Sequence, residues 1–380
     1  MSIKTDIHWC DSTVNPEMGC LGCELFSPPE VVLECIDAAI ARVCARAKGQ
    51  TREIFTRLIY DAYDRIPDPG LGHVRAVINT NIWNLREQFC EEIARRFNKP
   101  AAKAAMQAIQ KSLKCYAWKL HIVRGQDITD PSRLGNTGYA PMFERVTQFP
   151  GRVATAAAYS DLLGLPHPGK PWLDGLPRVI FVSDMGDALS RVSDFDFLEE
   201  DMIPAISSEA GLKHLWLWLS KRPTNMARFS QRIGGFPPNL CAMTTVTGPA
   251  TLHRIDQLRE VQAEVKGLSI EPLLELIPME LLDLSGIDWV VLGGESGAKK
   301  AVTTFDVRTV REMIEHCRER GVGVFVKQLG AKSALNGAPL NLKDSHGADW
   351  TEWPADIRVR QFPGYFHNYR PAQQGAVVLP

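Results

Sequence analysis

The chain has 380 residues, of which 45% are hydrophobic, and its formal net charge at pH 7 is −1. This length fits one large α/β domain with an inserted piece, or two domains. Acidic and basic residues are mixed along the chain, which speaks against a protein that binds nucleic acid mainly through phosphates. No apolar run approaches the roughly 20 residues that span a bilayer, and the first 13 residues lack a signal-peptide core, so we expect a cytoplasmic protein with no membrane contact.

A pair of cysteines stands close to the amino terminus. A short strand is predicted at "IHW" (7–9), and "NPEMGCLGCELF" (15–26) follows it with Cys20 and Cys23 in C-x-x-C spacing. The glycines beside them permit a bend that brings two thiols to one metal. This spacing suits a zinc site, a dithiol pair or part of an iron–sulfur cluster. The candidates for further zinc ligands are Cys10, Cys115, His8 and His121.

Residues 24–112 predict an all-helical insertion. The stretches 28–49, 81–98 and 100–113 have apolar residues at helical spacing and few clusters of β-branched residues. Residues 124–177 are rich in glycine and proline and indicate irregular connecting structure with a helix at 152–163. The nine cysteines of a chain without an export signal indicate reduced thiols, most of them in the core.

From residue 178 onward the chain repeats a short apolar run, a polar turn and a helix-sized connector. Apolar runs of this length indicate buried parallel strands in βα units. Together with the amino-terminal strand they predict an α/β fold with a partial or complete (β/α) barrel, built from residues 1–23 and 113–330. Residues 331–380 are expected to form a loop-rich carboxyl-terminal extension. The six runs are "RVIFVSDMGD" (178–187), "HLWLWLSKRP" (214–223), "LCAMTTVTG" (240–248), "GLSIEPL" (267–273), "DWVVLGGESG" (288–297) and "GVFVKQLG" (323–330).

Polar residues gather where these strands end. Ligands of parallel βα folds bind at the carboxyl ends of the strands, so these residues predict a binding site. They are Ser183, Asp184, Asp187, Ser220, Lys221, Arg222, Thr244, Thr245, Thr247, Glu271, Gly293, Gly294, Glu295, Ser296, Lys327 and Gln328.

Each of these residues also has a structural explanation. Asp184 or Asp187 could cap the helix that follows it. Glu271 and Lys327 stand in apolar strands and must be paired or bound to a ligand, and they could pair with each other. The glycines of the turn at 293–296 expose N–H groups to an anion, but turns need glycine in any case.

The ordered set of motifs resembles one family, the phage Gp37/Gp68-like, three-Cys-motif proteins (DUF5131-type), which are themselves similar to radical S-adenosylmethionine (SAM) enzymes. The chain departs from the family in three features: the first two cysteines are close together, the helical stretch separates Cys23 from Cys115, and Leu329 replaces a common aromatic residue. Cys10 is the alternative third ligand. The motifs are Trp9 and Asp11, Asn15-Pro16, Gly19-Cys20, Cys23 and Cys115-Tyr116-Ala117, followed by "FVSDMGD", "LSKRP", "SIEPL", "GIDWVVLGGESG" and "FVKQLG".

The resemblance implies a radical SAM-type barrel and a [4Fe-4S] cluster held by Cys20, Cys23 and Cys115. In such enzymes SAM chelates the fourth iron, and one electron, from a reductant such as flavodoxin or ferredoxin, cleaves SAM to a 5′-deoxyadenosyl radical that abstracts hydrogen from the substrate. The implied SAM-binding residues are Asp184 for the methionine ammonium, Ser220, Lys221 and Thr245 near the carboxylate or ribose, Glu271 near the ribose, and Gly293, Gly294, Glu295 and Ser296 near the adenine or methionine. Lys327 and Gln328 would face substrate or SAM.

The substrate implied by phage relatives is a nucleobase or nucleotide in DNA or RNA, with the helical insertion as its docking surface. Cys241 is a candidate hydrogen donor, although a core thiol is the commoner role. A second hypothesis is a non-catalytic, zinc-bound nucleotide- or nucleic-acid-binding module. A third is a metal-dependent hydrolase that uses Asp184, Asp187 and Glu271, which lacks the histidines expected at strand ends.

Overall fold

The computed structural model describes residues 2–26, 29–63, 82, 85–112, 114–125, 140, 143, 146–300 and 302–370. Parts of the predicted irregular stretch 124–177 and of the carboxyl-terminal extension lie outside these described residues. The chain divides into two compact units: unit 1 comprises Met1–Pro16 and Phe149–Pro380, and unit 2 comprises Glu17–Gln148. The borders predicted after residues 23, 112 and 330 lie at other positions than the borders of these two compact units. The predicted domains stay a prediction.

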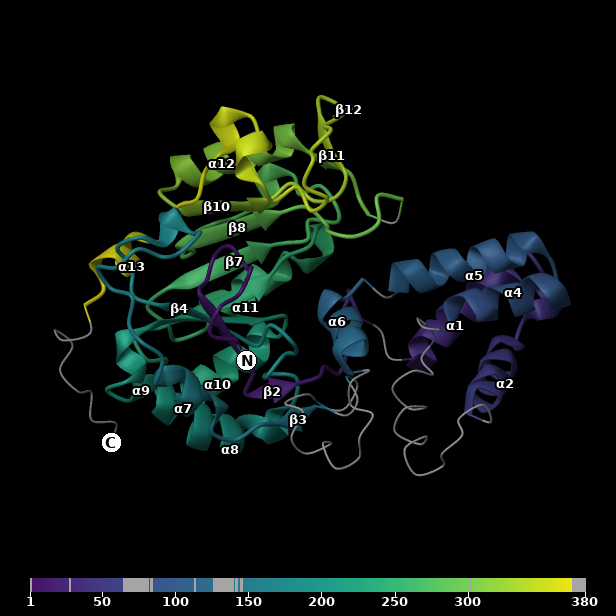
Figure 1. Ribbon diagram of the computed structural model, residues 1–380, viewed down its shortest axis with the longest axis horizontal. Helices are drawn as coiled ribbons and strands as arrows, with labels where there is room; N and C mark the ends of the chain where they lie inside the picture. Colours follow the sequence, from purple (N-terminus) through teal and green to yellow (C-terminus); the bar gives the residue numbers. More distant parts are fainter. Residues whose placement is uncertain are drawn as a thin grey trace. The chain divides into compact units, whose positions relative to one another are not determined.

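Unit 1 is built on a curled half-barrel sheet of seven strands (Figure 1). All neighbouring strands are parallel, as the six apolar runs predicted. In spatial order the strands are β1 (Ser12–Val14), β4 (Val179–Val182), β5 (Leu215–Ser220), β6 (Leu240–Thr245), β7 (Lys266–Ile270), β8 (Trp289–Gly293) and β10 (Gly323–Gln328).

Side chains alternate between the two faces of this sheet, because successive residues of a strand point to opposite sides. Ile180, Trp216 and Ala242 belong to one buried cluster, on the convex face, together with apolar residues of the helices. Their neighbours in sequence belong to a second cluster on the concave face, which also contains Trp9 and Phe362. The concave members from the strands are Val179, Phe181, Leu215, Leu217, Cys241, Met243, Trp289, Val291 and Phe325.

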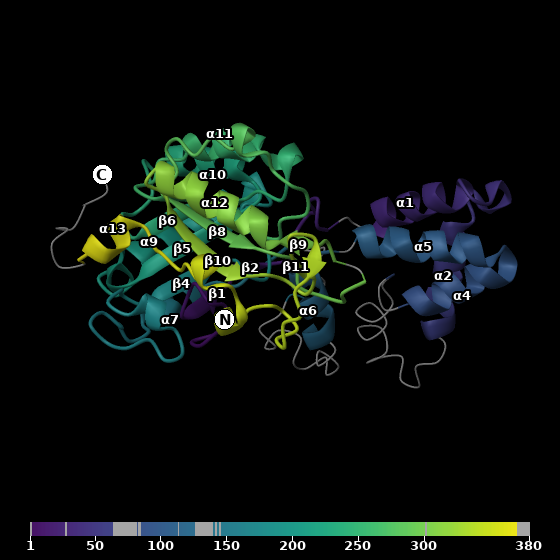
Figure 2. The same cartoon turned by 90° about the horizontal axis from the view of Figure 1, so that it is seen from above.

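Helices α7 to α12 of unit 1 line the convex face, and Figure 2 shows α10, α11 and α12 side by side along the sheet, whereas α13 contributes Phe366 to the concave cluster. Each of α10, α11 and α12 contributes apolar residues at helical spacing to the convex cluster, for example Met226 and Phe229 of α10. The helices are α7 (Arg152–Ala157), α8 (Phe195–Phe197), α9 (Ile203–Ser207), α10 (Pro223–Arg232), α11 (His253–Arg259), α12 (Val307–Glu319) and α13 (Gly364–Asn368). A small second sheet contains β9 (Phe305–Asp306), β11 (Ser333–Leu335) and β12 (Ala338–Pro339).

The amino-terminal strand lies later than predicted. The strand predicted at residues 7–9 is wrong in position, because β1 is Ser12–Val14 and pairs with Ile180–Val182. Trp9 instead packs its ring on Phe181, with 4.6 Å between ring centroids, and fills the concave face.

Both outer strands of the half-barrel are covered by further segments. Ser2 exchanges two backbone hydrogen bonds of 2.9 Å with Thr13 of β1. Beside β10, the Val326 N–H donates to Val359 and the Gln361 N–H to Val324, at 2.8 and 2.9 Å. Covered edges do not offer free N–H and C=O groups for closure, so the partial barrel, rather than a complete one, is the form observed.

Unit 2 contains helices at the stretches whose spacing predicted them, and a short antiparallel pair of strands. Figures 1 and 2 show α5 beside α1 and α4. Buried apolar residues such as Ile36, Phe89 and Ile109 form the contacts of this helical group. The elements are β2 (Glu17–Met18), α1 (Pro29–Ala41), α2 (Thr51–Tyr63), α4 (Arg86–Arg96), α5 (Lys99–Ser112), α6 (Tyr116–Gly125) and β3 (Thr147–Gln148).

The predicted fold class is therefore confirmed at the level of an α/β protein with a parallel, barrel-like sheet. The radical SAM type of barrel stays a prediction. Within the described part of the chain, each helix is too short or too polar to cross a membrane.

Candidate functional site

The carboxyl ends of the unit 1 strands carry a polar layer on the concave side. Phe181, Met243 and Phe325 point into the concave cluster, and residues two positions further along a strand share that face. Alternation along β6 and β8 places Thr245 and Gly293 on this face, Ser183 follows β4, and the contact of Glu271 with Lys327 and Gly293 places these residues together, so a polar rim lies above an apolar floor. Its members, called the strand-end layer below, are Ser183, Thr245, Glu271, Gly293 and Lys327.

Glu271 and Lys327 pair with each other across this layer. Lys327 Nζ lies 2.5 Å from Glu271 Oε1, and the two side chains are 20% and 12% exposed. The bond crosses over β8 at Gly293, where an added Cβ would lie 3.1 Å from the Glu271 side chain. The structural alternative considered for these two residues is thus observed, and Gly293 provides the space for it.

Asp184 is held by Asn15, a residue near the amino terminus. Asn15 Nδ2 donates to Asp184 Oδ1 at 2.6 Å, and the Met185 N–H donates to Asn15 Oδ1 at 2.8 Å. Ser183, just before Asp184, has a φ of 69°, in the left-handed region that non-glycine residues rarely adopt. The turn after β4 is therefore fixed by Asn15, and this fixation maintains a strained serine.

Asp187 joins the turns after β4 and β5 through hydrogen bonds. Its carboxylate accepts hydrogen bonds from Ser220 Oγ at 2.8 Å and from the Lys221 N–H at 3.0 Å. It also accepts the Leu189 N–H at 3.1 Å, in the manner of a turn or cap. Ser220, predicted to contact a ligand, is thus engaged by Asp187 and joins the turns after β4 and β5.

Two buried hydroxyls of the strand ends have no such partner. Ser183 Oγ and Thr245 Oγ1 make no hydrogen bond with any described residue, and the residues are only 5% and 1% exposed. A buried hydroxyl without a partner costs free energy, and such groups in native proteins point to a ligand or bound water. These atoms fit a polar ligand at the strand-end layer.

The glycine turn after β8 is packed against the chain that follows β10. The Gly294 N–H donates to the Gln328 carbonyl at 3.0 Å, and Gln328 Nε2 donates to the Gly294 carbonyl at 2.9 Å. A Cβ on Gly294 would lie 2.5 Å from the Leu329 carbonyl oxygen. Glu295 is buried and accepts the Thr303 N–H at 3.1 Å, whereas Ser296 is exposed. The N–H of Gly294 is therefore used internally.

The three cysteines of the predicted cluster lie in unit 2 and share one local geometry. Each sulfur accepts a backbone N–H at 3.4 Å: Gly22 donates to Cys20, Leu25 to Cys23 and Trp118 to Cys115. The Cys115 N–H donates to the Leu25 carbonyl at 2.7 Å, which joins the third cysteine to the turn of the second. Across the described ranges, however, no three Cys, His, Asp or Glu side chains are gathered as a metal-binding group.

The thiols of the concave core behave differently. The Cys10 and Cys241 sulfurs are buried and donate to the carbonyls of Ile7 and Ala242, at 4.0 and 3.9 Å. Burial raises the pKa of both thiols well above the ordinary value. These two sulfurs are suited to packing as thiols, whereas those of Cys20, Cys23 and Cys115 accept backbone N–H groups.

The two histidines considered as zinc ligands differ in surroundings. In unit 1, burial and the positive charges of Arg360 and Lys327 lower the pKa of His8 to about 4, and these charges disfavour a cation there. In unit 2, His121 is buried and its Nε2 lies 2.7 Å from the Ala140 carbonyl. Of the two, His121 has the oriented ring that a metal ligand needs.

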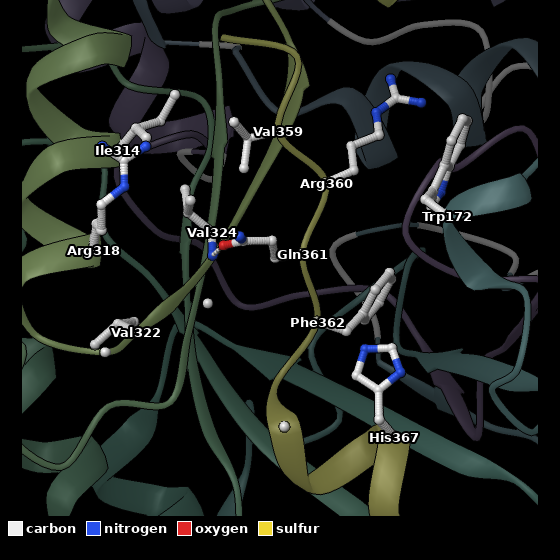
Figure 3. Close-up of a pocket in the computed structure, with 13 residues that line it drawn as sticks. Trp172, Ile314, Arg318, Val322, Val324, Val359, Arg360, Gln361, Phe362 and His367 are labelled. Atoms are coloured by element: carbon white, nitrogen blue, oxygen red, sulfur yellow. Dashed lines mark hydrogen bonds between the residues drawn. The ribbon is translucent and has the colours of Figure 1, made fainter. Parts of the chain in front are cut away.

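A pocket of about 570 Å³ lies elsewhere, at the amino end of β10 (Figure 3). Gly323, the first residue of β10, lines it, and Arg360 lies beside it with its guanidinium 3.9 Å from the Trp172 ring centroid. Residues of the strand-end layer are absent from its lining. Ligands of parallel α/β sheets usually bind at the carboxyl ends of the strands, so the strand-end layer stays the predicted binding site.

The three carboxylates of the hydrolase hypothesis are bound to three different partners. Asp184 binds Asn15, Asp187 binds Ser220, and Glu271 binds Lys327. This arrangement does not form the shared oxygen-ligand site that a hydrolytic metal needs. Sequence reasoning missed the Asn15 bond and the strain at Ser183, although the position of Ser183, two residues beyond an inward phenylalanine, already indicated its face.

Fold and site together define a class: a parallel α/β half-barrel with a polar strand-end layer, joined to a unit that carries a C-x-x-C turn. A family model described as a protein of unknown function (DUF5131) matches residues 101–363, more than half of the chain, so the chain belongs to this family. The match includes Cys115 and the polar ends of β4 to β10, whereas Cys20 and Cys23 precede it. No curated protein and no solved structure matches the chain.

Proposed function

We propose that this protein is a radical SAM enzyme, in which Cys20, Cys23 and Cys115 hold a [4Fe-4S] cluster and the strand-end layer binds SAM. When bound, the cluster supplies the electron that cleaves SAM to a 5′-deoxyadenosyl radical, which takes hydrogen from the substrate. The observation that carries the proposal is the set of three N–H···S hydrogen bonds, one at each predicted cysteine.

These hydrogen bonds are of the kind that the sulfur ligands of iron–sulfur clusters accept from the backbone. Backbone N–H groups aimed at a sulfur stabilise negative charge on it, and in clusters they also tune the reduction potential. Cys115 is supported over Cys10 as the third ligand because its backbone is bonded to Leu25, whereas Cys10 is packed among apolar side chains. Three thiolates leave one iron of a [4Fe-4S] cluster for SAM.

The chain's own residues offer SAM a set of oriented polar groups. Asp184, held by Asn15, presents a carboxylate to an ammonium group. The hydroxyls of Ser183 and Thr245 would donate to a carboxylate or a ribose oxygen and would thereby be satisfied. Glu271 keeps one oxygen in the bond to Lys327 and has the other for a ribose hydroxyl.

The remaining predicted residues act by positioning. Ser220 and the Lys221 N–H hold Asp187, and Gly294 and Gln328 hold the turn after β8. Their rigidity keeps the layer in place and limits water around the bound ligand. In the proposed reaction flavodoxin or ferredoxin is the electron donor, and a nucleobase or nucleotide in DNA or RNA is the substrate.

The test is anaerobic purification followed by iron and sulfide analysis, then incubation with SAM and a chemical reductant. We expect about four irons and four sulfides per chain and formation of 5′-deoxyadenosine. Cys115→Ala should lose the cluster and SAM cleavage, whereas Cys35→Ala, at an exposed cysteine of the same unit, should keep both. A Cys115→Ala variant that retains a full cluster would contradict the ligand assignment.

A structural zinc site is the second candidate, favoured by the buried and oriented His121 of α6. In that case the same thiols would hold zinc, and the protein would be a non-catalytic nucleotide- or nucleic-acid-binding module. Stoichiometric zinc without sulfide, lost in His121→Ala, would establish this candidate and exclude the radical mechanism.

A further inference from the structure

Helix α5 (Lys99–Ser112) lies in a stretch of the chain that has no acidic residue. The 34 residues from 93 to 126 contain eight Lys and Arg and no Asp or Glu. The whole chain has 43 basic and 44 acidic residues, so its net charge does not show this local excess of basic residues. The stretch is therefore a basic segment inside a neutral protein.

The fold turns this segment into a charged face. Ala101, Ala105 and Ile109 of α5 are buried, and the small volumes of the two alanines allow close packing against the neighbouring helices. The exposed residues stand on the other side at spacings of three, four and seven, so they share one face. This Lys/Gln face consists of Lys99, Lys103, Gln107, Gln110 and Lys111.

Among the described residues, the lysines of this face are not balanced by acids. Lys99, Lys103 and Lys111 form no ion pair with a described residue. On the adjoining helix α4 the basic residues are neutralised, since Arg95 and Arg96 both bind Glu92 at 2.7 Å. An ordinary solvated face resembles α4, with opposite charges three or four residues apart.

The first lysine also opposes the helix dipole. Lys99 is the first residue of α5, whose first turn has no acid, and Asn98 caps it by accepting the Ala101 N–H at 2.8 Å. A cation at a helix amino terminus is unfavourable for stability. A lysine at position 99 therefore does not stabilise α5, and an anionic partner outside the chain would explain it better.

We propose that the Lys/Gln face of α5 binds the phosphate backbone of duplex DNA. Lys99 and Lys111 are 12 residues apart, about 18 Å along the helix axis, and this length can reach about three successive phosphates of one strand. Lysine ammonium and glutamine amide groups both donate to phosphate oxygens and read no sequence. The face exposes no aromatic side chain for base stacking, which favours a duplex over a single strand, and its one exposed apolar residue, Pro100, is too small for insertion into a membrane.

This inference rests on the proposed function and deepens it, because it names duplex DNA as the polymer that carries the proposed substrate. Phosphate binding by α5 needs neither the cluster nor SAM, so either proposal can fail without the other. It is tested on the full chain, as purified and without reductant, by fluorescence anisotropy with a labelled DNA duplex of arbitrary sequence. The variant is Lys99→Gln/Lys103→Gln/Lys111→Gln, which keeps good helix formers on α5. The matched control is Lys213→Gln/Lys332→Gln/Lys343→Gln, which removes the same charge from exposed positions of unit 1.

We expect the α5 variant to bind the duplex at least about tenfold more weakly at roughly 50 mM salt, and its plot of log affinity against log salt to be less steep by about 3. The control should bind like the wild type, and circular dichroism should show unchanged helix content in both. Equal weakening in the two triple variants would overturn the proposal. So would tighter binding to single-stranded DNA, to duplex RNA or to phosphatidylserine vesicles, because the face would then serve another partner.

Discussion

The two ends of the unit 1 sheet differ in how fully their buried polar side chains are hydrogen-bonded. At the amino end, Asp11 accepts from His167 and from the Val179 N–H, each at 2.8 Å, and Lys170 donates to three backbone carbonyls. At the carboxyl end, the hydroxyls of Ser183 and Thr245 have no described partner. A fully satisfied network stabilises a fold, whereas an incomplete one leaves binding capacity for a ligand.

Among the described residues the amino end also contains polar atoms without partners: the side chains of His214 and Asn239 are anchored through another atom, whereas Trp9 Nε1 has no partner. His214 Nε2 lies 3.0 Å from the Ala157 carbonyl, and Asn239 Nδ2 donates to the carbonyl of Gly211 at 2.9 Å. Ser183 and Thr245 each have a single polar side-chain atom, so without a hydrogen bond at that atom their side chains make no polar contact with a described residue. We propose from this difference that the amino end serves mainly stability and the carboxyl end ligand binding, which is the usual division in parallel α/β folds.

The largest expected effect is at the amino end. Asp11→Ala removes the partner of buried His167 and of the Val179 N–H, and we expect the free energy of unfolding to fall by about 4 kcal/mol. Urea denaturation measures it, with exposed Asp6→Ala as the control that changes little. A small effect of Asp11→Ala would remove the contrast between the two ends.

The ion pair of the strand-end layer is the next test. Lys327→Met leaves the Glu271 carboxylate largely buried and unpaired, which should cost about 3 kcal/mol in urea denaturation. Adding Glu271→Gln should restore most of the loss, because the unpaired charge is then gone. If the double variant is no more stable than Lys327→Met, the two residues do not depend on each other.

His8 gives a smaller effect that depends on pH. Its pKa is lowered from 6.5 to about 4, chiefly by burial and then by Arg360 and Lys327. Between these values the unfolded chain binds a proton that the folded chain does not, so the free energy of unfolding falls as pH falls. We expect wild type to lose about 2 kcal/mol between pH 6.5 and 5 from this group, and His8→Gln to lack that contribution. Parallel stability curves for the two proteins would contradict the assignment.

Sequence reasoning located the strands and the polar positions, because apolar runs and their polar ends are local properties. It could not choose among partners that are far apart in the chain. Asn15 binds Asp184 across 169 residues, and Asp187 engages Ser220 across 33, and only the sheet register brings these together. The charge of α5 was readable in the sequence, but a net charge of −1 over 380 residues concealed it.

The smallest expected effect concerns the strained serine, and here stability and binding should change in opposite directions. Ser183→Gly removes the cost of a positive φ and the unpartnered hydroxyl, so the free energy of unfolding should rise by about 1 kcal/mol. SAM binding, measured by calorimetry on the reconstituted protein, should weaken because a donor is lost. Ser183→Ala keeps the strain and removes only the hydroxyl, so it should weaken binding with less gain in stability. A glycine variant that is less stable than the wild type would show that the Ser183 hydroxyl is bonded within the fold, and the carboxyl end would then resemble the amino end.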